Sequence, residues 1–158
     1  MITFNIISVG TLKEKYLVDA TKEYIKRLEP FAKVNLIEVR ESALSNNASA
    51  SEINKAKQIE AQDLKQRAKG FLVALEIKGK SMTSEEFSKK IDELATSGVS
   101  EISFIIGGSN GLDDEFSRGC NLQLSFSSFT FPHQLMRVIM LEQLYRAMCI
   151  INNKTYHK

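Results

Sequence analysis

The sequence predicts one α/β domain, residues 1–158, built on a mostly parallel sheet of five to six strands flanked by helices. Short apolar runs rich in β-branched residues alternate along the chain with longer stretches of helical periodicity, which is typical of parallel α/β folds. A length of 158 residues fits one hydrophobic core. No repeat or linker divides the chain, so we expect a single domain.

The first strand and the first helix are predicted in the opening thirty residues. The run Ile2–Val9 alternates as a strand does and lacks the basic leader and cleavage site of a signal peptide. Lys13–Glu29 has helical periodicity, and Pro30 is expected to end this helix because a proline ring disrupts helical hydrogen bonding. The residues predicted to form its inner face recur at every fourth position: Tyr16, Ala20, Tyr24 and Leu28.

The next elements are predicted in the order strand, loop, helix and strand. Val34–Arg40 is a second apolar run, and the polar, small residues 41–50 are expected to form a mobile surface loop. A helix is predicted over Ser49–Gly70, because Glu52 lies at the capping-box position three residues after the first serine. Phe71–Leu75 follows as a third strand.

A third helix is predicted over Thr83–Gly98, where a second capping box opens the helix and a glycine closes it. Two further strands, Glu101–Ile106 and Asn121–Phe126, follow it. The apolar residues that this third helix is expected to bury are Phe87, Ile91 and Leu94.

The last helix, which we expect to begin at Pro132, differs from the others because apolar residues cover most of its circumference. Such a helix must be covered on several sides, and one sheet face covers only one of them. The helix is therefore either fully internal or part of a subunit interface, and we favour an interface in which methionines supply adaptable packing. The apolar positions are Leu135, Met136, Val138, Ile139, Met140, Leu141, Leu144, Ala147 and Met148.

The composition excludes several classes of protein. No stretch reaches the roughly 18 apolar residues that a membrane span requires, so we expect a cytoplasmic protein. The net charge of +2 is only a weak indication of a polyanionic partner. Cys120 and Cys149 lack CxxC spacing, and His133 and His157 complete no metal pattern with them. We therefore predict two reduced, partly buried thiols and no metal site.

A glycine-rich turn follows the fourth predicted strand, within Phe104–Leu112. Three glycines in five residues require positive φ angles or the close approach of another group. The spacing G-G-x-x-G differs from the dinucleotide fingerprint, and the Lys-Ser/Thr pair of a P-loop is missing. We favour a turn that cradles a ligand over one that is purely structural.

The same turn also matches the pattern G-x-S-x-G, which makes Ser109 a candidate nucleophile of a serine hydrolase. Asp113 would then be the acid, and His133 or His157 the base. The chain is short for a hydrolase sheet, it offers no counterpart of the oxyanion loop, and so short a pattern arises easily by chance. A non-catalytic RNA-binding or assembly module is a second alternative.

Several segments, taken in order, form a pattern that runs essentially from end to end of the chain. The most specific is Thr130–Val138 followed by Glu142–Ala147. The others are Leu75–Lys80, Phe104–Leu112, Leu124–Pro132 and Tyr156–Lys158. The chain resembles the ribosomal RNA large subunit methyltransferase H family. Members of that family methylate N3 of a pseudouridine in 23S ribosomal RNA and belong to the SPOUT superfamily of enzymes with a C-terminal trefoil knot.

The resemblance implies a bent S-adenosyl-L-methionine held by the loops of the knot. The expected positions follow the carboxyl ends of three predicted strands, where open α/β sheets bind ligands. Because this cofactor carries an activated methyl group, the protein needs mainly to align the reacting atoms. Matched residue by residue, the cofactor contacts are Leu75, Gly107, Phe126, Ser127, Ser128, Phe129, Thr130 and Phe131.

The closing residues Tyr156, His157 and Lys158 would be expected, on the sequence alone, to be solvated. The resemblance instead implies that this tail reaches the site of the partner subunit in a homodimer and helps to hold the RNA. Tyr156 would stack on a base and Lys158 would meet a phosphate. His157 is the candidate general base for the N3 proton, with an RNA clamp as its alternative role.

Four polar residues of the last helix have less specific expectations. Arg137 binds an RNA phosphate or pairs structurally across the dimer, and His133 is expected to bond a loop carbonyl. Glu142 and Arg146 have the spacing of an ion pair on a helix surface. Because a charge of +2 gives little attraction for naked RNA, we expect the assembled ribosome, with its composite surface, to be the partner.

Overall fold

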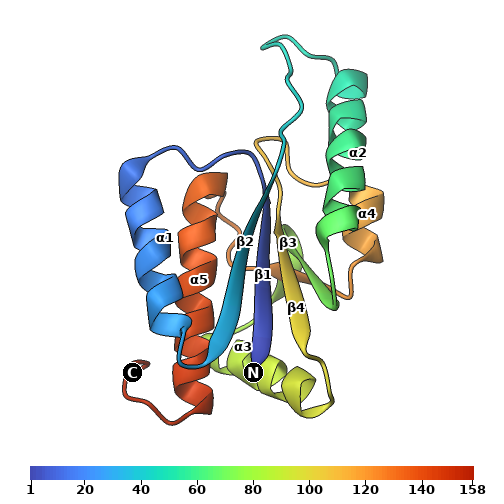
Figure 1. Ribbon diagram of the computed structural model, residues 1–158. Coiled ribbons are helices and arrows are strands. Elements are labelled where there is room, and N and C mark those ends of the chain that lie inside the picture. The colour runs from blue at the N-terminus through green and yellow to red at the C-terminus, as the bar shows by residue number, and fades with distance from the viewer.

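The computed structural model describes residues 1–158 and contains five strands and five helices (Figure 1). The strands are β1 (Ile2–Val9), β2 (Ala32–Val39), β3 (Phe71–Ser81), β4 (Glu101–Ile106) and β5 (Leu122–Ser125). The helices are α1 (Lys15–Leu28), α2 (Ala50–Arg67), α3 (Ser84–Thr96), α4 (Asp114–Gly119) and α5 (His133–Ile151). All strand pairs are parallel in the order β2-β1-β4-β3-β5, which confirms the predicted α/β class.

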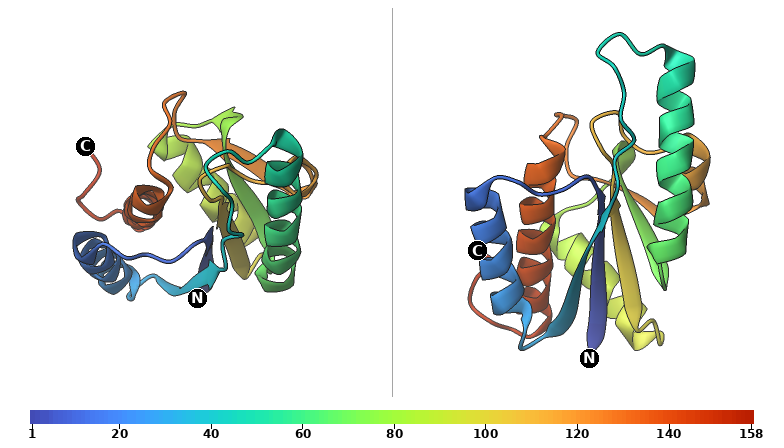
Figure 2. Two further views of the ribbon diagram at one scale, coloured as in Figure 1. Left: turned by 90° about the horizontal axis from the view of Figure 1, so that it is seen from above. Right: turned by 45° about the horizontal axis from the view of Figure 1, so that its top comes forward.

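Each face of the sheet has its own hydrophobic core. Side chains alternate along a strand, so Phe4 and Ile6 of β1 point to one face while Ile7 and Val9 point to the other. The first face packs against α1, α3 and α5, and the second against α2 and α4 (Figure 2). The loops after β1, β2 and β4 therefore meet at the same edge, at the top of Figure 1.

Local sequence signals determine where the helices begin. The side chains of Ser49 and Thr83 each accept a hydrogen bond from the backbone N–H three residues later. In both cases the glutamate at that later position accepts a hydrogen bond from the backbone N–H of the serine or threonine. The two predicted capping boxes are thus confirmed. The last helix begins at His133 rather than at Pro132, which instead occupies the N-cap position. None of the helices has both the length and the hydropathy to cross a membrane.

The predicted inner face of α1 is correct in part: Leu28 is fully buried and Tyr24 packs against the core. Tyr16 is 69% exposed, whereas Leu17 and Thr21, which were not predicted, are buried. The two rows of residues are adjacent on the helix, and both contain apolar side chains, so the spacing alone does not separate them. Packing against α5 and the sheet buries Leu17 and Thr21 in the first half of the helix, where Tyr16 and Ala20 were expected.

Strand β3 extends well beyond the predicted Leu75. After pairing Leu75 with Leu124, the chain bulges outward, and Lys80 then pairs with Leu124 again. Three of the four residues in the bulge, Glu76, Lys78 and Gly79, are charged or glycine, so the sequence gives little sign that the strand continues. Strand β5 is correspondingly short and is held by two separate parts of β3. The trefoil knot stays a prediction.

Candidate active site

A cavity of about 710 Å³ lies at the bulge of β3 and at the carboxyl ends of β4 and β5. Three segments line it: residues 75–77 of β3, residues 106–112 after β4, and much of the stretch 124–136, which joins β5 to α5. The segments are far apart in the sequence, and the parallel sheet brings their strand ends to one place. This is the edge at which open α/β sheets bind ligands.

Seven of the eight residues expected to contact the cofactor line this cavity, which places them together without testing what they bind. The eighth, Ser128, is exposed and lies outside the lining. The seven are Leu75, Gly107, Phe126, Ser127, Phe129, Thr130 and Phe131.

The buried hydroxyl of Ser125 holds two of the lining segments together. Its Oγ lies 2.7 Å from the carbonyl oxygen of Ile77 and 3.2 Å from that of Ser127. The Ser127 hydroxyl in turn accepts a hydrogen bond from the Phe129 N–H at 3.0 Å. The loop after β5 is therefore shaped by its own serines, and the ring of Phe129 is left 79% exposed at the rim of the cavity.

The glycine turn forms the second wall. A Cβ atom at residue 107 would lie 2.7 Å from the carbonyl carbon of Gly111, and Gly111 itself has a φ of +81°. The Gly111 N–H donates to the Gly108 carbonyl at 3.0 Å, which closes the turn. The close approach and the positive φ both require glycine, as the sequence indicated.

The serine-hydrolase alternative finds no support in the geometry. The Ser109 hydroxyl donates to the Glu41 carboxylate at 2.8 Å, and Asp113 caps α4 by accepting from the Phe116 N–H. No histidine bonds to Ser109, so the structure assembles no nucleophile–base–acid triad.

His133 and Glu76 also line the cavity, although neither was predicted to do so. His133 was expected to bond a loop carbonyl, but its imidazole makes no hydrogen bond within the chain. Both positions were detectable in principle, because Glu76 directly follows Leu75 and His133 begins the helix that follows the 126–131 stretch.

Arg137 makes its hydrogen bonds within its own subunit, and its expected roles toward RNA or across a dimer stay predictions. Its guanidinium is 4% exposed and forms an ion pair with Glu38 at 2.7 Å, and a second nitrogen donates to the Gly10 carbonyl at 2.8 Å. These bonds join α5 to the carboxyl ends of β1 and β2 within one subunit.

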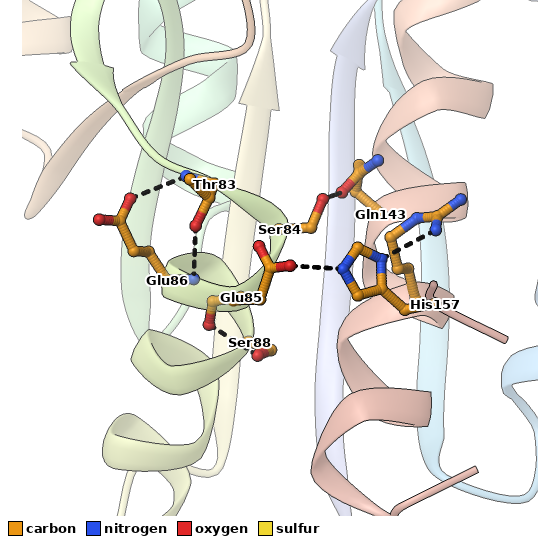
Figure 3. Close-up of polar contacts among 8 residues, drawn as sticks. Thr83, Ser84, Glu85, Glu86, Ser88, Gln143 and His157 are labelled. Carbon is orange, nitrogen blue, oxygen red and sulfur yellow. Dashed lines mark hydrogen bonds and ion pairs between the residues drawn. The ribbon is translucent and has the colours of Figure 1, made fainter. Parts of the chain in front are cut away.

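The tail folds back onto its own subunit, where Tyr156 and His157 are half-buried and bonded rather than solvated, while Lys158 is exposed as the sequence alone suggested (Figure 3). His157 Nε2 lies 2.6 Å from the Glu85 carboxylate, and Nδ1 lies 3.1 Å from an Arg146 nitrogen. The Tyr156 hydroxyl donates to Glu142 at 3.0 Å, and Glu142 forms the predicted ion pair with Arg146. None of residues 156–158 lines the cavity of its own subunit.

These contacts define the hydrogen-bonding state of His157. Arginine can only donate, so Nδ1 must accept from Arg146 and the Nε2 proton is directed at Glu85. The bond from His157 lowers the pKa of Glu85 below its ordinary value. Burial, followed by the bond to Glu142, raises the pKa of Tyr156 to about 12, so this phenol remains a donor at neutral pH.

Comparisons with known proteins agree with this architecture. A family model described as "Predicted SPOUT methyltransferase" matches residues 2–157, nearly the whole chain. The chain belongs to the SPOUT methyltransferase family. The resemblance stated from the sequence motifs is thereby confirmed.

This SPOUT methyltransferase is similar to curated relatives over nearly its full length. It is 48% identical to a protein from Desulforamulus reducens over 100% of both chains, and 48% identical to one from Clostridium botulinum strain Hall over 98% of both. A relative from Natranaerobius thermophilus is 43% identical, again over 98% of each chain. All three are named ribosomal RNA large subunit methyltransferase H.

A solved structure of a methylase family protein from Haemophilus influenzae shares the fold. It superposes with a TM-score of 0.55 at 12% sequence identity, and the match covers 95% of this SPOUT methyltransferase. The chain spans 66% of the length of that larger protein.

Proposed function

We propose that this SPOUT methyltransferase transfers a methyl group from S-adenosyl-L-methionine to N3 of a pseudouridine in 23S ribosomal RNA, with the assembled cytoplasmic ribosome as its substrate. The observation that carries the proposal is the cavity in which Leu75, Gly107 and the 126–131 stretch meet. The names of the curated relatives support ribosomal RNA as the substrate.

The cavity suits the cofactor in size and chemistry. Its volume of about 710 Å³ lies within the range of pockets that hold ligands of this size. Leu75, Phe126 and Phe131 offer apolar walls for an adenine ring, and the carboxylate of Glu76 can accept hydrogen bonds from ribose hydroxyls. The cofactor, when bound, supplies an electrophilic methyl group on a sulfonium.

The contribution of the chain is then mainly positional. The acceptor nitrogen has to lie in line with the methyl group at near van der Waals distance, and it has to lose its proton. His157 serves this step as a general base or as a clamp on the RNA. Because Arg146 occupies the lone pair of Nδ1, a base role requires the tail to leave Arg146 first.

A homodimer formed through α5 would bring the tail of one subunit to the cavity of the other. Leu135, Val138 and Ile139 are half-buried but do not belong to the core of their own subunit. They share one helix face with Glu142 and Arg146, which the tail covers. A second copy packed on the uncovered part of this face would bury the apolar residues.

Calorimetry with S-adenosyl-L-methionine, followed by transfer of a labelled methyl group to purified ribosomes, tests the proposal. We expect saturable binding and transfer to N3 of a pseudouridine in the large-subunit RNA. A protein that does not bind the cofactor would instead be the RNA-binding module considered above. Equal rates on short protein-free RNA and on ribosomes would contradict recognition of a composite ribosomal surface.

Replacement of His157 by alanine tests the tail. We expect the affinity for S-adenosyl-L-methionine to be retained and the turnover on ribosomes to fall at least tenfold, in line with the contribution of a general base. Lys154→Ala, which removes an exposed side chain of the same tail, is the matched control. Unchanged turnover in His157→Ala would remove this residue from the mechanism.

A further inference from the structure

A second cavity, of about 550 Å³, lies at the carboxyl ends of β1 and β2. Nine residues line it, and Val39 is the only hydrophobic one among them. The composition of its wall contrasts with that of the first cavity, which has nine hydrophobic residues among nineteen. A cavity of this size could accommodate a nucleotide, and its walls would offer that nucleotide mainly polar partners.

The two cavities adjoin. His133 lines both, and Glu41 of the second cavity accepts the hydroxyl hydrogen bond of Ser109, which lines the first. Adjacency matters because methyl transfer is direct: the acceptor nitrogen must come within about 3–3.5 Å of the methyl group. A pocket for the acceptor nucleotide therefore has to open next to the cofactor cavity.

A third hollow, of about 200 Å³, also adjoins the first cavity and shares Phe126 and Phe131 with it. Six of its nine lining residues are hydrophobic. A uracil-type base presents two carbonyls and two N–H groups, and its ribose adds hydroxyls. Burying any of these groups without a hydrogen-bond partner costs free energy. The polar cavity is thus the better match in both size and chemistry.

The charges of the polar cavity are arranged for a phosphate backbone. The carboxylate of Glu38 is neutralised by Arg137 and also accepts the Leu12 N–H at 2.7 Å. Lys13 and Arg40 are exposed and take part in none of the ion pairs of the chain. Glu41 is the remaining negative charge, and its carboxylate is held by Ser109.

We propose that the polar cavity is the subsite for the target nucleotide, an inference that rests on the proposed RNA methylation. Lys13 and Arg40 bind the phosphates that flank the target. His133, in the wall between the cavities and without a hydrogen-bond partner in the chain, bonds the polar edge of the base. The nucleotide enters beside the cofactor, and its N3 faces the wall that the cavities share.

Substitution of the two cations tests the subsite. We expect Lys13→Gln and Arg40→Gln each to raise the KM for ribosomes about threefold to tenfold and to lower the salt dependence of binding by about one phosphate contact. The Kd for S-adenosyl-L-methionine should stay within twofold of the wild-type value. Lys33→Gln is the matched control, because Lys33 is an exposed lysine at the opposite end of strand β2, which leads to Arg40.

The imidazole of His133 provides a direct readout. With isotope-labelled histidine and S-adenosylhomocysteine bound, titration with pseudouridine 5′-monophosphate should shift the ring signals of His133 saturably, whether or not those of His157 also respond. The Arg40→Gln variant should need more nucleotide for the same shift.

The outcomes separate the two proposals. If the wild type neither binds S-adenosyl-L-methionine nor methylates ribosomes, the proposed function fails. If the wild type is active but Lys13→Gln and Arg40→Gln behave as Lys33→Gln does, the subsite is overturned. Variants that lose only affinity for the cofactor would also overturn the subsite. So would a titration in which the nucleotide shifts the ring signals of His157 but not those of His133.

Discussion

At residue 107 the backbone leaves no room for a side chain. A Cβ atom there would lie 2.7 Å from the Gly111 carbonyl carbon and 3.0 Å from the Leu112 nitrogen, and neither backbone atom can rotate away as a side chain could. The substitution Gly107→Ala should therefore displace the turn, cost about 1–3 kcal/mol of stability and lower cofactor affinity at least tenfold. Thermal unfolding and calorimetry measure the two effects.

A matched control is available in the same half of the chain. A Cβ atom at Gly119 would meet nothing within 4 Å, so Gly119→Ala should change neither the melting temperature nor the affinity appreciably. Equal behaviour of the two variants would show that the turn adapts and that its glycines are dispensable.

Glu60 is a buried carboxylate whose ionisation should make stability depend on pH. It is 7% exposed, and burial raises its pKa, although the Ser42 N–H partly offsets the shift. The pKa of Glu60 is higher in the folded protein than in the unfolded chain. The contribution of Glu60 to stability is therefore complete below the pKa of the unfolded state and is lost as the pH rises through the pKa of the folded state. Glu60→Gln should raise the melting temperature at pH 7 by about 2–4 °C and have no effect near pH 4.

Asp63→Asn, on an exposed position of the same helix, is the control for charge alone. A melting temperature that falls at pH 7 in Glu60→Gln would mean that the carboxylate stabilises the loop at Ser42 more than its burial costs.

At the scale of single residues, the sequence indicated those site positions that follow directly from strand ends. Gly107 and Phe126 line the cavity because a parallel sheet brings such ends together, and Leu75 joins them at the point where β3 bulges. The settings of His133 and Arg137 were not predictable in this way. Both lie on one helix, and the elements against which that helix packs determine whether a side chain faces a cavity or an internal carboxylate.

Among the elements, α3 depends on its capping box. Thr83 and Glu86 satisfy two backbone N–H groups at the start of the helix, and Glu85 in the same turn binds the tail. Thr83→Ala should cost about 1 kcal/mol of stability, seen as a lower melting temperature. Thr96→Ala, an exposed change at the other end of the helix, should have almost no effect. Equal losses in both variants would argue against the cap as the cause.

The prediction of elements succeeded where one signal dominated. Strands β1 and β4 have the predicted bounds, since each is a short run rich in β-branched and aromatic residues with no glycine or proline inside it. The second half of β3 was missed because Lys78, Gly79 and Lys80 are typical of a loop, and only pairing with β5 makes them part of a strand. Long-range pairing of this kind leaves no local pattern in the chain.

For the whole molecule, the proposed dimer makes activity depend on association. Ile139→Glu places a charge on the uncovered face of α5, so we expect sedimentation to show monomers, and turnover to be lost while the cofactor is still bound. Ile59→Glu, at a 49% exposed position of α2, should leave the oligomeric state unchanged. A wild-type protein that sediments as a monomer would contradict the dimer itself.

The double pairing of β3 with β5 has a consequence for biosynthesis. Residues 122–125 complete the outer edge of β3, and the last wall of the cavity follows them in the chain. While the ribosome is still translating the preceding segments, that edge lacks its partner, and unpaired edges favour wrong association. A nascent chain therefore acquires its ligand-binding capacity only when the final third has emerged, and pairing of this one strand removes the edge at which aggregation would begin.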